Sequence, residues 1–347
     1  MSFYLEKNMI VSSFFKGAVI GVANIIPGVS GGTMALVLGI YERLIDAIHN
    51  INSVTAKSLF NLVLFKESAW SDFKEELKRI DALFLIIIAA GAISAVFALA
   101  GIMTMLLKEY HDPTYGFFFG LVLVSAWAPY VLIKRKKAWV VWIAACIAAL
   151  LVVITAEAVS SGDALIEKAK VKQEQALKKT TGVSPATESH SSSRGPGYFF
   201  YFFILGAVAI STMILPGVSG SFLLLLLGGY FDVIRAVHKL DWILIFFIIG
   251  CLVGILFFSR FLNFLIKRYH DQTMGFLLGL VAGSLWMIWP FKDSVKIGEE
   301  VIFLANRLPS SLSINEGMTL LSTLAGMGVV ALLFYIEKRN ASSKIEE

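Results

Sequence analysis

The chain has 347 residues, of which 57% are hydrophobic and 16% are charged, and its mean hydropathy is +0.76. Soluble domains contain about 45–50% apolar and about 25% charged residues, so this composition excludes a soluble globular enzyme. The net charge is +5, but Lys and Arg cluster at the ends of apolar tracts, which indicates membrane topology rather than nucleic-acid binding.

The first predicted element is a helical hairpin over residues 10–48, interrupted by the sequence PGVSGGT at residues 27–33. Its two arms, about 10–26 and 33–48, are each short for the ~30 Å hydrocarbon core of a bilayer. We therefore predict a re-entrant hairpin that enters and leaves the membrane on one face.

A polar stretch over residues 52–79 follows, with apolar residues at helical spacing. This pattern is typical of a helix that lies on the membrane surface; a helix that docks a partner is the alternative. Spans at 82–107, 114–133 and 138–157 complete a first repeat over residues 1–157. Residues 158–197, rich in Lys, Ser, Thr, Gln and Ala, are predicted to be a flexible extracytoplasmic linker.

The second half, residues 198–347, repeats the first. Residues 27–49 and 216–238 agree at 12 of 23 positions, and residues 108–122 and 267–281 agree at 10 of 15. The predicted fold class is therefore an all-α integral membrane protein of two repeats, each a re-entrant helical hairpin plus three transmembrane helices. The elements of the second repeat are a hairpin over 198–238 and spans at 242–266, 273–291 and 319–336.

The number of crossings predicts the relation between the repeats. Each repeat crosses the membrane an odd number of times, so the second is inverted relative to the first, as in many secondary transporters. Outside the two longest loops, 12 Lys and Arg residues fall on the side of the N-terminus and six on the other. Since cytoplasmic loops are richer in Lys and Arg, both termini of this multi-pass protein are predicted to be cytoplasmic.

Each hairpin turn is predicted to leave backbone N–H groups without helical partners inside the membrane. Helix N-termini carry a partial positive charge and bind anions, phosphate above all. The alternative is that the small residues only let helices pack closely. Two such turns in inverted repeats favour a substrate phosphate-binding site. Its predicted residues are Pro27, Gly28, Val29, Ser30, Gly31, Gly32, Thr33, Pro216, Gly217, Val218, Ser219, Gly220 and Ser221.

Charged residues near the turns are candidates for a gate. Arg43 and Asp46 follow the first turn, and Asp232 and Arg235 follow the second with the signs exchanged. As i, i+3 neighbours, the members of each pair can instead form local salt bridges. Arg260 lies inside an apolar span, where a charge costs a few kcal/mol unless it is paired or snorkels, so it is a further candidate.

The tripeptide Tyr-His-Asp occurs at residues 110–112 and 269–271 and invites a catalytic role. Asp112, however, precedes Pro113 and a new apolar helix, so helix capping is the favoured interpretation. The sequence lacks the spacings of zinc proteases, nucleotide-binding loops and lipid phosphatases, and it has no cluster of metal-ligating residues. We therefore predict no enzymatic activity, no cofactor and no metal.

The chain resembles the bacterial polyprenyl-phosphate transporter family, domain of unknown function 368, in the elements NIIPGVSGGTMALVLGIYERLIDAI, ILPGVSGSFLLLLLGGYFDVI, YHDPTYGFFFGL and YHDQTMGFLLGL. The resemblance covers nearly the whole chain. It implies a flippase in the bacterial cytoplasmic (inner) membrane that moves undecaprenyl phosphate from the outer to the inner leaflet for reuse in cell-wall synthesis. It also implies that the two turns bind the phosphate.

The predicted partners are a polyprenyl phosphate lipid and membrane lipids, not nucleic acid, and a homo-oligomer is left open. A secondary transporter or channel for a small soluble anion is the alternative, since facing helix N-termini also suit chloride or carboxylates. An opening for a lipid tail between the spans would favour the lipid, and a closed aqueous pore would favour the anion.

Overall fold

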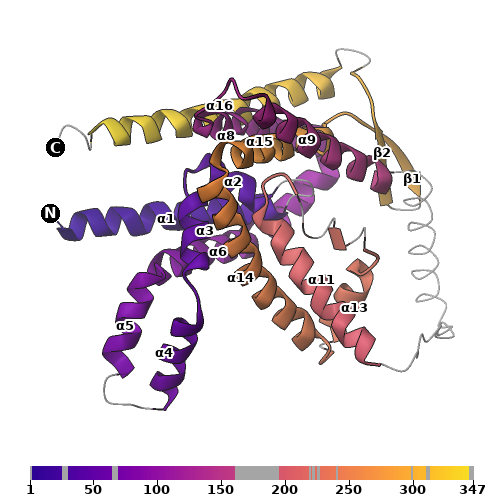
Figure 1. Ribbon diagram of the computed structural model, residues 1–347. Helices are drawn as coiled ribbons and strands as arrows, with labels where there is room; N and C mark the ends of the chain where they lie inside the picture. Colours follow the sequence, from indigo (N-terminus) through magenta and orange to yellow (C-terminus); the bar gives the residue numbers. More distant parts are fainter. Residues whose placement is uncertain are drawn as a thin grey trace.

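The computed structural model describes residues 2–25, 30–64, 69–160, 195–218, 220, 223–224, 227–239, 241–297, 300–309 and 313–343. These residues form a helical molecule with one two-stranded ribbon (Figure 1). The first half contains α1 (Ser2–Ile25), α2 (Gly31–Val37), α3 (Tyr41–His49), α4 (Ser53–Val63), α5 (Ala69–Arg79), α6 (Ala82–Glu109), α7 (His111–Ser125), α8 (Trp127–Leu132) and α9 (Trp139–Ser160). The second half contains α11 (Pro196–Ile214), α13 (Tyr230–Lys239), α14 (Leu244–Arg268), α15 (His270–Met287), β1 (Lys292–Ile297), β2 (Glu300–Asn306) and α16 (Ile314–Ser343).

Six helical segments among the described residues are long and apolar enough to cross a membrane, so the chain is a multi-pass membrane protein. Five correspond to predicted spans. The sixth is α11, which lies within the predicted hairpin over 198–238. With 19 residues it is long and apolar enough to cross a membrane. The segments are Ala82–Leu99, His111–Leu132, Trp139–Glu157, Pro196–Ile214, Leu244–Arg268 and Ile314–Ile336.

The predicted span 273–291 corresponds to α15, which ends at Met287 and is not one of the six. This helix begins with the polar residues His-Asp-Gln, and it is packed inside the protein. Met274 and Leu277 are completely buried there. Because most of α15 is buried against other helices, it requires a less continuous apolar sequence than an exposed span.

The predicted surface helix over 52–79 is two helices, α4 and α5, which pack against each other. Asn52 and Thr55 form a capping box that starts α4. The Glu76 carboxylate accepts hydrogen bonds from Thr55 Oγ1 and from Arg79 Nη2, which lies at 2.6 Å. Hydrogen bonding from Arg79 holds the pKa of Glu76 at about 2. These contacts join the two helices into an arm at the lower left of Figure 1.

The all-α prediction missed the ribbon. β1 and β2 pair antiparallel between α15 and α16, with Lys292 opposite Asn306 and Ile297 opposite Glu300. The β-branched residues Val295, Ile302 and their neighbours favour strands, but the charged residues around them are typical of a loop.

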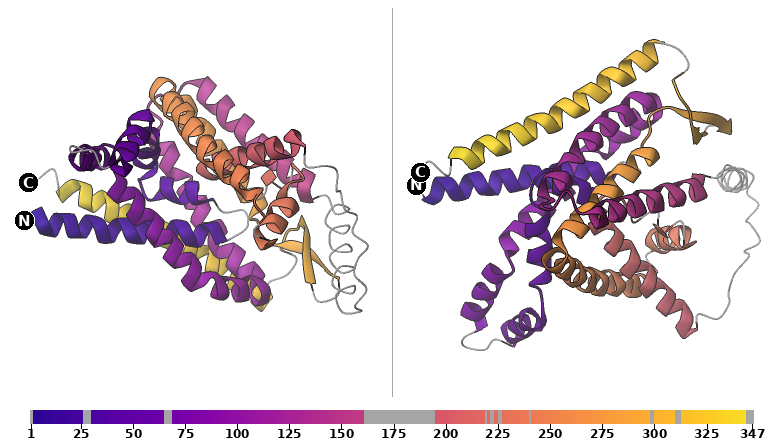
Figure 2. Two further views of the ribbon diagram at one scale, coloured as in Figure 1. Left: turned by 90° about the horizontal axis from the view of Figure 1, so that it is seen from below. Right: turned by 45° about the horizontal axis from the view of Figure 1, so that its top comes forward.

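The long helices pack in four close pairs, and two of these pairs exchange helices between the halves (Figure 2). α1 packs on α6, and α11 packs on α14. α16, from the second half, packs on α7 of the first, while α9 packs on α15. Close approach requires glycine: a Cβ on Gly120 would lie 2.0 Å from the Thr323 carbonyl oxygen, and one on the equivalent Gly279 would lie 2.0 Å from that of Ala145.

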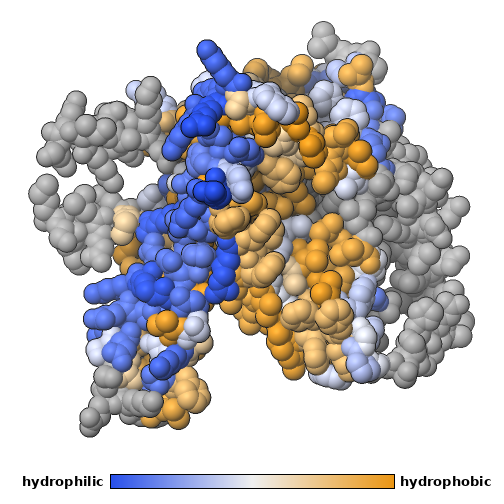
Figure 3. Space-filling model, in the orientation of Figure 1, coloured by the Kyte–Doolittle hydropathy of each residue, from blue (hydrophilic) through white to orange (hydrophobic). Residues whose placement is uncertain are grey.

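Contacts along each pair show that the paired helices run parallel. They are Gly17 with Ile88 and Gly21 with Ala92, Gly206 with Phe247 and Gly254 with Ala207, Gly116 with Thr319 and Gly120 with Thr323, and Gly275 with Val141 and Gly279 with Ala145. Both ends of the chain lie on the same side of the molecule in Figure 1. Hydrophilic residues gather over the side that carries α4 and α5, and hydrophobic residues gather over the middle (Figure 3).

Candidate functional site

The first predicted turn leads from α1 into the short helix α2. Pro27, Gly28 and Val29 lie outside the described residues. Ser30 is the N-cap of α2, and its Oγ accepts a hydrogen bond from Gly32 N (3.2 Å), while its carbonyl accepts from Thr33 N (3.0 Å). Asn24 Oδ1 accepts from Gly31 N (3.0 Å). The first backbone amides of α2 were predicted to be free, but in this structure each has an acceptor within the protein.

Asn24 is a residue that the sequence analysis did not select. It is the last polar residue of α1, three positions before Pro27, and a polar side chain at this depth of an apolar helix was the available signal. Lys16 was also overlooked: its Nζ donates to the Leu38 carbonyl (2.7 Å) at the end of α2. A cation is favourable there because the C-terminal end of a helix carries a partial negative charge.

The second predicted turn follows α11. Pro216, Gly217 and Gly220 are buried, and Val218 is half-buried. Gly217 has φ +79°, and a Cβ on it would lie 2.3 Å from the Leu280 carbonyl oxygen, so only glycine fits this position. Ser219 and Ser221 lie outside the described residues.

The two turns touch. Ser30 Oγ donates to the Leu215 carbonyl (3.0 Å), and Gly217 N donates to Thr33 Oγ1 (2.9 Å). Gly32 lies so close to the end of α11 that a Cβ would be 2.4 Å from the Ile214 carbonyl oxygen. α1 and α11 reach this point from different sides of the molecule (Figure 1). The structure therefore brings together the segments that the sequence repeat selected, and we call this meeting point the elbow contact.

Arg43 does not form the local salt bridge with Asp46 that was one of the two interpretations. Its Nε lies 2.7 Å from Asp81 Oδ2, and its guanidinium carbon lies 4.0 Å from the centroid of the Phe84 ring. Asp81 has φ +51°, a left-handed conformation that costs a non-glycine residue about 1–2 kcal/mol. Arg43 thus joins α3 to the start of α6.

The other gate candidates do not form one cluster with Arg43. Asp46 accepts a hydrogen bond from Asn263 Nδ2 and lies 3.5 Å from Lys267 Nζ, both on α14. Arg260, also on α14, donates from Nη2 to the Ile51 carbonyl (2.9 Å), just after α3. Asp232 lies on α13, far along the chain from these contacts. Arg235 also belongs to α13, and its side chain lies outside the described part of the chain.

The aspartates of the two Tyr-His-Asp segments are not the N-caps of their own helices. The N-cap residues of α7 and α15 are Tyr110 and Tyr269 instead. Asp112 accepts from Asn315 Nδ2 (3.2 Å) near the start of α16. Asp271 accepts from the backbone N–H groups of Lys134 (2.9 Å) and Arg135 before α9. The hydrogen bond from Lys134 N lowers the pKa of Asp271 below its ordinary value. Each aspartate therefore tethers the helix that the other half contributes.

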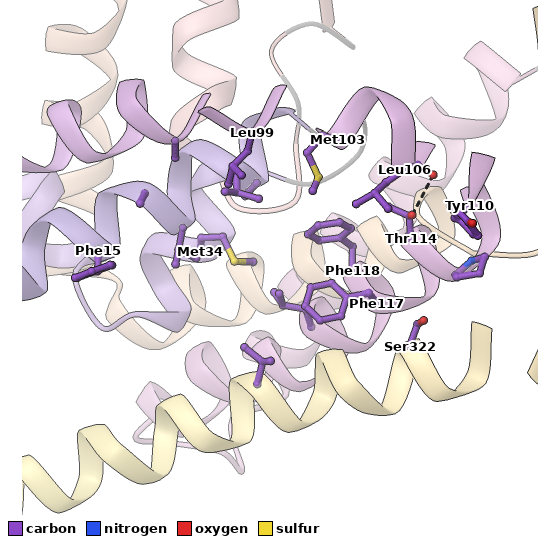
Figure 4. Close-up of a pocket in the computed structure, with 18 residues that line it drawn as sticks. Phe15, Met34, Leu99, Met103, Leu106, Tyr110, Thr114, Phe117, Phe118 and Ser322 are labelled. Carbon is purple, nitrogen blue, oxygen red and sulfur yellow. Dashed lines mark hydrogen bonds between the residues drawn. The ribbon is translucent and has the colours of Figure 1, made fainter. Parts of the chain in front are cut away.

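An apolar groove of about 680 Å³ runs beside the elbow contact (Figure 4). α1, α2, α6, α7 and α16 all line it. Met34, four positions after Ser30, lies at one place on its wall, and Tyr110 and Thr114 lie at another. The Thr114 hydroxyl is occupied, because it donates to the Leu106 carbonyl (3.2 Å). The volume is within the about 300–1,000 Å³ range of ligand pockets.

The groove offers a ligand hydrocarbon contacts rather than hydrogen bonds. Within the part of the chain that the structure describes, no group of three or more His, Cys, Asp or Glu residues is placed to hold a metal ion. The site is therefore the elbow contact between two interrupted helices, with the apolar groove beside it. Its lining side chains include Phe15, Val19, Val22, Leu99, Met103, Leu106, Phe117, Phe118, Leu121 and Val329.

The fold and the site define a multi-pass helical membrane protein in which two interrupted helices meet beside an apolar groove. The chain belongs to the VCA0040-like family, described as undecaprenyl phosphate translocase-like, whose model matches residues 20–302. It is 33% identical to the "Polyprenyl-phosphate transporter" of Vibrio cholerae serotype O1, over 94% of this chain and 96% of that protein. It is 29% identical to the protein of the same name in Staphylococcus aureus, over 80% of this chain and 86% of that protein. No solved structure matches the chain.

Proposed function

We propose that the protein transports a polyprenyl phosphate across the bacterial cytoplasmic membrane, moving undecaprenyl phosphate from the outer to the inner leaflet for reuse in cell-wall synthesis. An ionised group is very unfavourable in hydrocarbon, whereas a prenyl tail dissolves there. The protein therefore needs to shield only the head group. A lipid that is moved and released unchanged requires no catalytic residue, so the proposal includes no enzymatic activity.

The apolar groove is the observation that carries this proposal. It adjoins the elbow contact through Met34 on α2, and its aliphatic and aromatic walls match the chemistry of a prenyl chain. A phosphate at the elbow contact and a tail in the groove would belong to one molecule. Largely apolar walls offer a small soluble anion few donors, which is why the lipid is preferred over the anion.

The proposed head-group site is the elbow contact with the predicted residues around it, Pro27–Thr33 and Pro216–Ser221. In the present structure Asn24 Oδ1 and Ser30 Oγ occupy the amides of Gly31 and Gly32. A phosphate oxygen is a stronger acceptor than either, because charge-assisted hydrogen bonds are roughly twice as strong as neutral ones. Binding would therefore exchange internal acceptors for the substrate.

The proposal also includes inverted repeats with re-entrant hairpins. α16 runs parallel to α7, and only the short segment 133–138 joins the span over α7 and α8 to α9, which is therefore expected to return in the opposite direction. On this basis α16 is expected to run opposite to its counterpart α9. Such an arrangement lets two similar paths open alternately to each leaflet. The excess of Lys and Arg on the side of both chain ends supports cytoplasmic termini.

Native mass spectrometry of the purified protein tests the proposal. We expect a co-purifying polyprenyl phosphate, and we expect its occupancy to fall in Leu99→Trp, which fills the groove. Phe97→Trp is the matched control, since Phe97 is on the same helix but 85% exposed on its outer face. Equal lipid occupancy in both variants would contradict the groove assignment, and no bound lipid in the wild type would contradict the function.

A further inference from the structure

A polar cleft of about 340 Å³ lies between α3 of the first half and α14 and α15 of the second. At about 30 Å³ for each molecule, it has room for about ten waters. It is separate from the apolar groove and shares no lining residue with it. The ionisable side chains that line it are Glu42, Asp46, Lys134, Lys267 and His270.

Carboxylates from α3 face two basic side chains of the cleft. Asp46 Oδ1 lies 3.5 Å from Lys267 Nζ, and Glu42 Oε1 lies 3.7 Å from His270 Nε2. Asn263, which is only 5% exposed, donates a hydrogen bond to Asp46 from the wall of the cleft. The two carboxylates therefore contact the second half from α3.

These ion pairs are weak by their geometry. Both distances exceed the about 2.7–2.9 Å of a charge-assisted hydrogen bond. The side chains of Asp46 and Lys267 are 51% and 67% exposed, and that of Glu42 is 51% exposed. Pairs between exposed side chains contribute little, because water screens them. A stronger anion can therefore replace the carboxylates at little cost.

We propose that this cleft is a second phosphate-monoester site, in which phosphate replaces Asp46 at Lys267 and Glu42 at His270. Lys134 supplies a second ammonium group from the loop before α9. This inference rests on the proposed function, because it gives the head group a station at the boundary between the two halves. Phosphate carries more charge than a carboxylate and accepts from several donors at once, so it competes well for the two lysines and for the His270 ring nitrogen.

The exchange of carboxylates for phosphate changes the contacts that α3 makes with the second half. Glu42 and Asp46 lie on α3, which follows α2 and the elbow contact in the chain. When phosphate takes their partners, α3 loses its ionic contacts with α14 and α15, while the hydrogen bonds from Asn263 to Asp46 and from Arg260 to the Ile51 carbonyl can remain. Arg43 does not take part, because Asp81 and Phe84 hold its guanidinium on the side of α6.

Calorimetric titration of the full-length purified protein with farnesyl phosphate tests the proposal. We expect Lys267→Gln to weaken binding about fivefold and Lys134→Gln with Lys267→Gln about 25-fold, since each lost contact to an exposed cation is worth about 1 kcal/mol. Lys136→Gln removes the same charge from the same loop outside the cleft, where Lys136 lies over the Tyr130 ring. This control should bind like the wild type.

Asp46→Asn separates the proposal from simple damage to the fold. It removes the competing carboxylate, so we expect farnesyl phosphate to bind about threefold more tightly, and misfolding cannot produce that gain. Equal affinity in the double Lys variant and the wild type, or weaker binding in Asp46→Asn, would overturn the proposal. Titration with inorganic phosphate distinguishes the source: equal dependence on Lys267 means that the cleft recognises phosphate itself, and binding of farnesyl phosphate alone means that it requires the prenyl-linked head group.

The outcome is distinguishable from failure of the proposed function. A wild type that co-purifies with polyprenyl phosphate, together with cleft variants of unchanged affinity, would sink only the cleft assignment. A wild type that binds no polyprenyl phosphate at all would sink the function on which it rests.

Discussion

Ser30 and Leu215 are 185 positions apart, yet the Ser30 hydroxyl donates a 3.0 Å hydrogen bond to the Leu215 carbonyl. A second hydrogen bond, from Gly217 N to Thr33 Oγ1, runs in the opposite direction between the same two segments. The interrupted helices of the two halves are therefore a single buried unit. Any change that moves one turn must either break these hydrogen bonds or move the other turn with it. This couples the two halves at the proposed head-group site.

Substitution at Thr33 tests this coupling. Thr33→Val keeps the shape but removes the acceptor of Gly217 N, which leaves a buried donor without a partner at a cost of about 1–3 kcal/mol. We expect a lower melting temperature in detergent for Thr33→Val and a smaller effect for Thr33→Ser, which retains an oxygen. If the two variants melted alike, the hydrogen bond would not stabilise the junction.

Asn24 is expected to compete with substrate. Asn24→Ala removes the acceptor of Gly31 N, so the lipid-free protein should melt at a lower temperature. A bound phosphate restores an acceptor, and undecaprenyl phosphate should therefore raise the melting temperature more in Asn24→Ala than in the wild type. Thermal shift with and without the lipid measures this difference. A smaller shift in the variant would mean that Asn24 contacts the lipid instead of competing with it.

The Arg43–Asp81 pair is expected to stabilise the structure rather than to bind substrate. Both side chains are more than a third exposed, at 41% and 37%, so solvent screens the pair. A double-mutant cycle with Arg43→Gln and Asp81→Asn should give a coupling energy of about 0.3–1 kcal/mol. Lipid binding should be unchanged in both variants. A large loss of lipid affinity in Arg43→Gln alone would restore Arg43 as a gate residue.

Asp271 predicts a dependence on acid. Its pKa is lowered from 3.8 in the folded protein by the N–H groups of Lys134 and Arg135 and by His270. A carboxyl group with a lowered pKa stabilises the fold above its unfolded pKa and loses that contribution as the pH falls through the folded value. The junction before α9 should therefore loosen below about pH 4. Hydrogen exchange near residues 133–139 should show this opening in the wild type.

Asp271→Asn should open the same segment at every pH and should remove the acid-dependent part. The matched control is Asp293→Asn, because Asp293 is an exposed aspartate in β1, after α15. Acid-dependent exchange that survives in Asp271→Asn would assign the opening to another group.

The sequence repeat predicted the elbow contact because the same Pro-Gly-Val-Ser-Gly segment interrupts an apolar tract in each half of the chain. The partners of single side chains were less accessible. Arg43 has Asp46 at helical spacing, but its carboxylate partner is Asp81, 38 residues later in the chain. The helices α4 and α5 lie between these two residues in the sequence. Local spacing gives only the neighbours on one helix, so long-range ion pairs such as Asp46–Lys267 are not encoded in it.

The exchange of α9 and α16 between the halves was also out of reach. Helices that are apolar on all sides show no preferred face, so their sequence does not select a partner. Gly120 and Gly279 mark close approach, but they do not identify the helix that approaches. The tethers of Asp112 and Asp271 depend on that exchange, which explains why capping was the favoured interpretation.

Lipid transport in proteoliposomes tests the central claim most directly. Wild-type protein, Leu99→Trp and Phe97→Trp would be reconstituted with undecaprenyl phosphate, and the lipid remaining in the outer leaflet would be followed with a phosphatase that cannot cross the membrane. We expect rapid exchange between leaflets for the wild type and Phe97→Trp and much slower exchange for Leu99→Trp. Chloride flux without any movement of the lipid in the wild type would contradict the account.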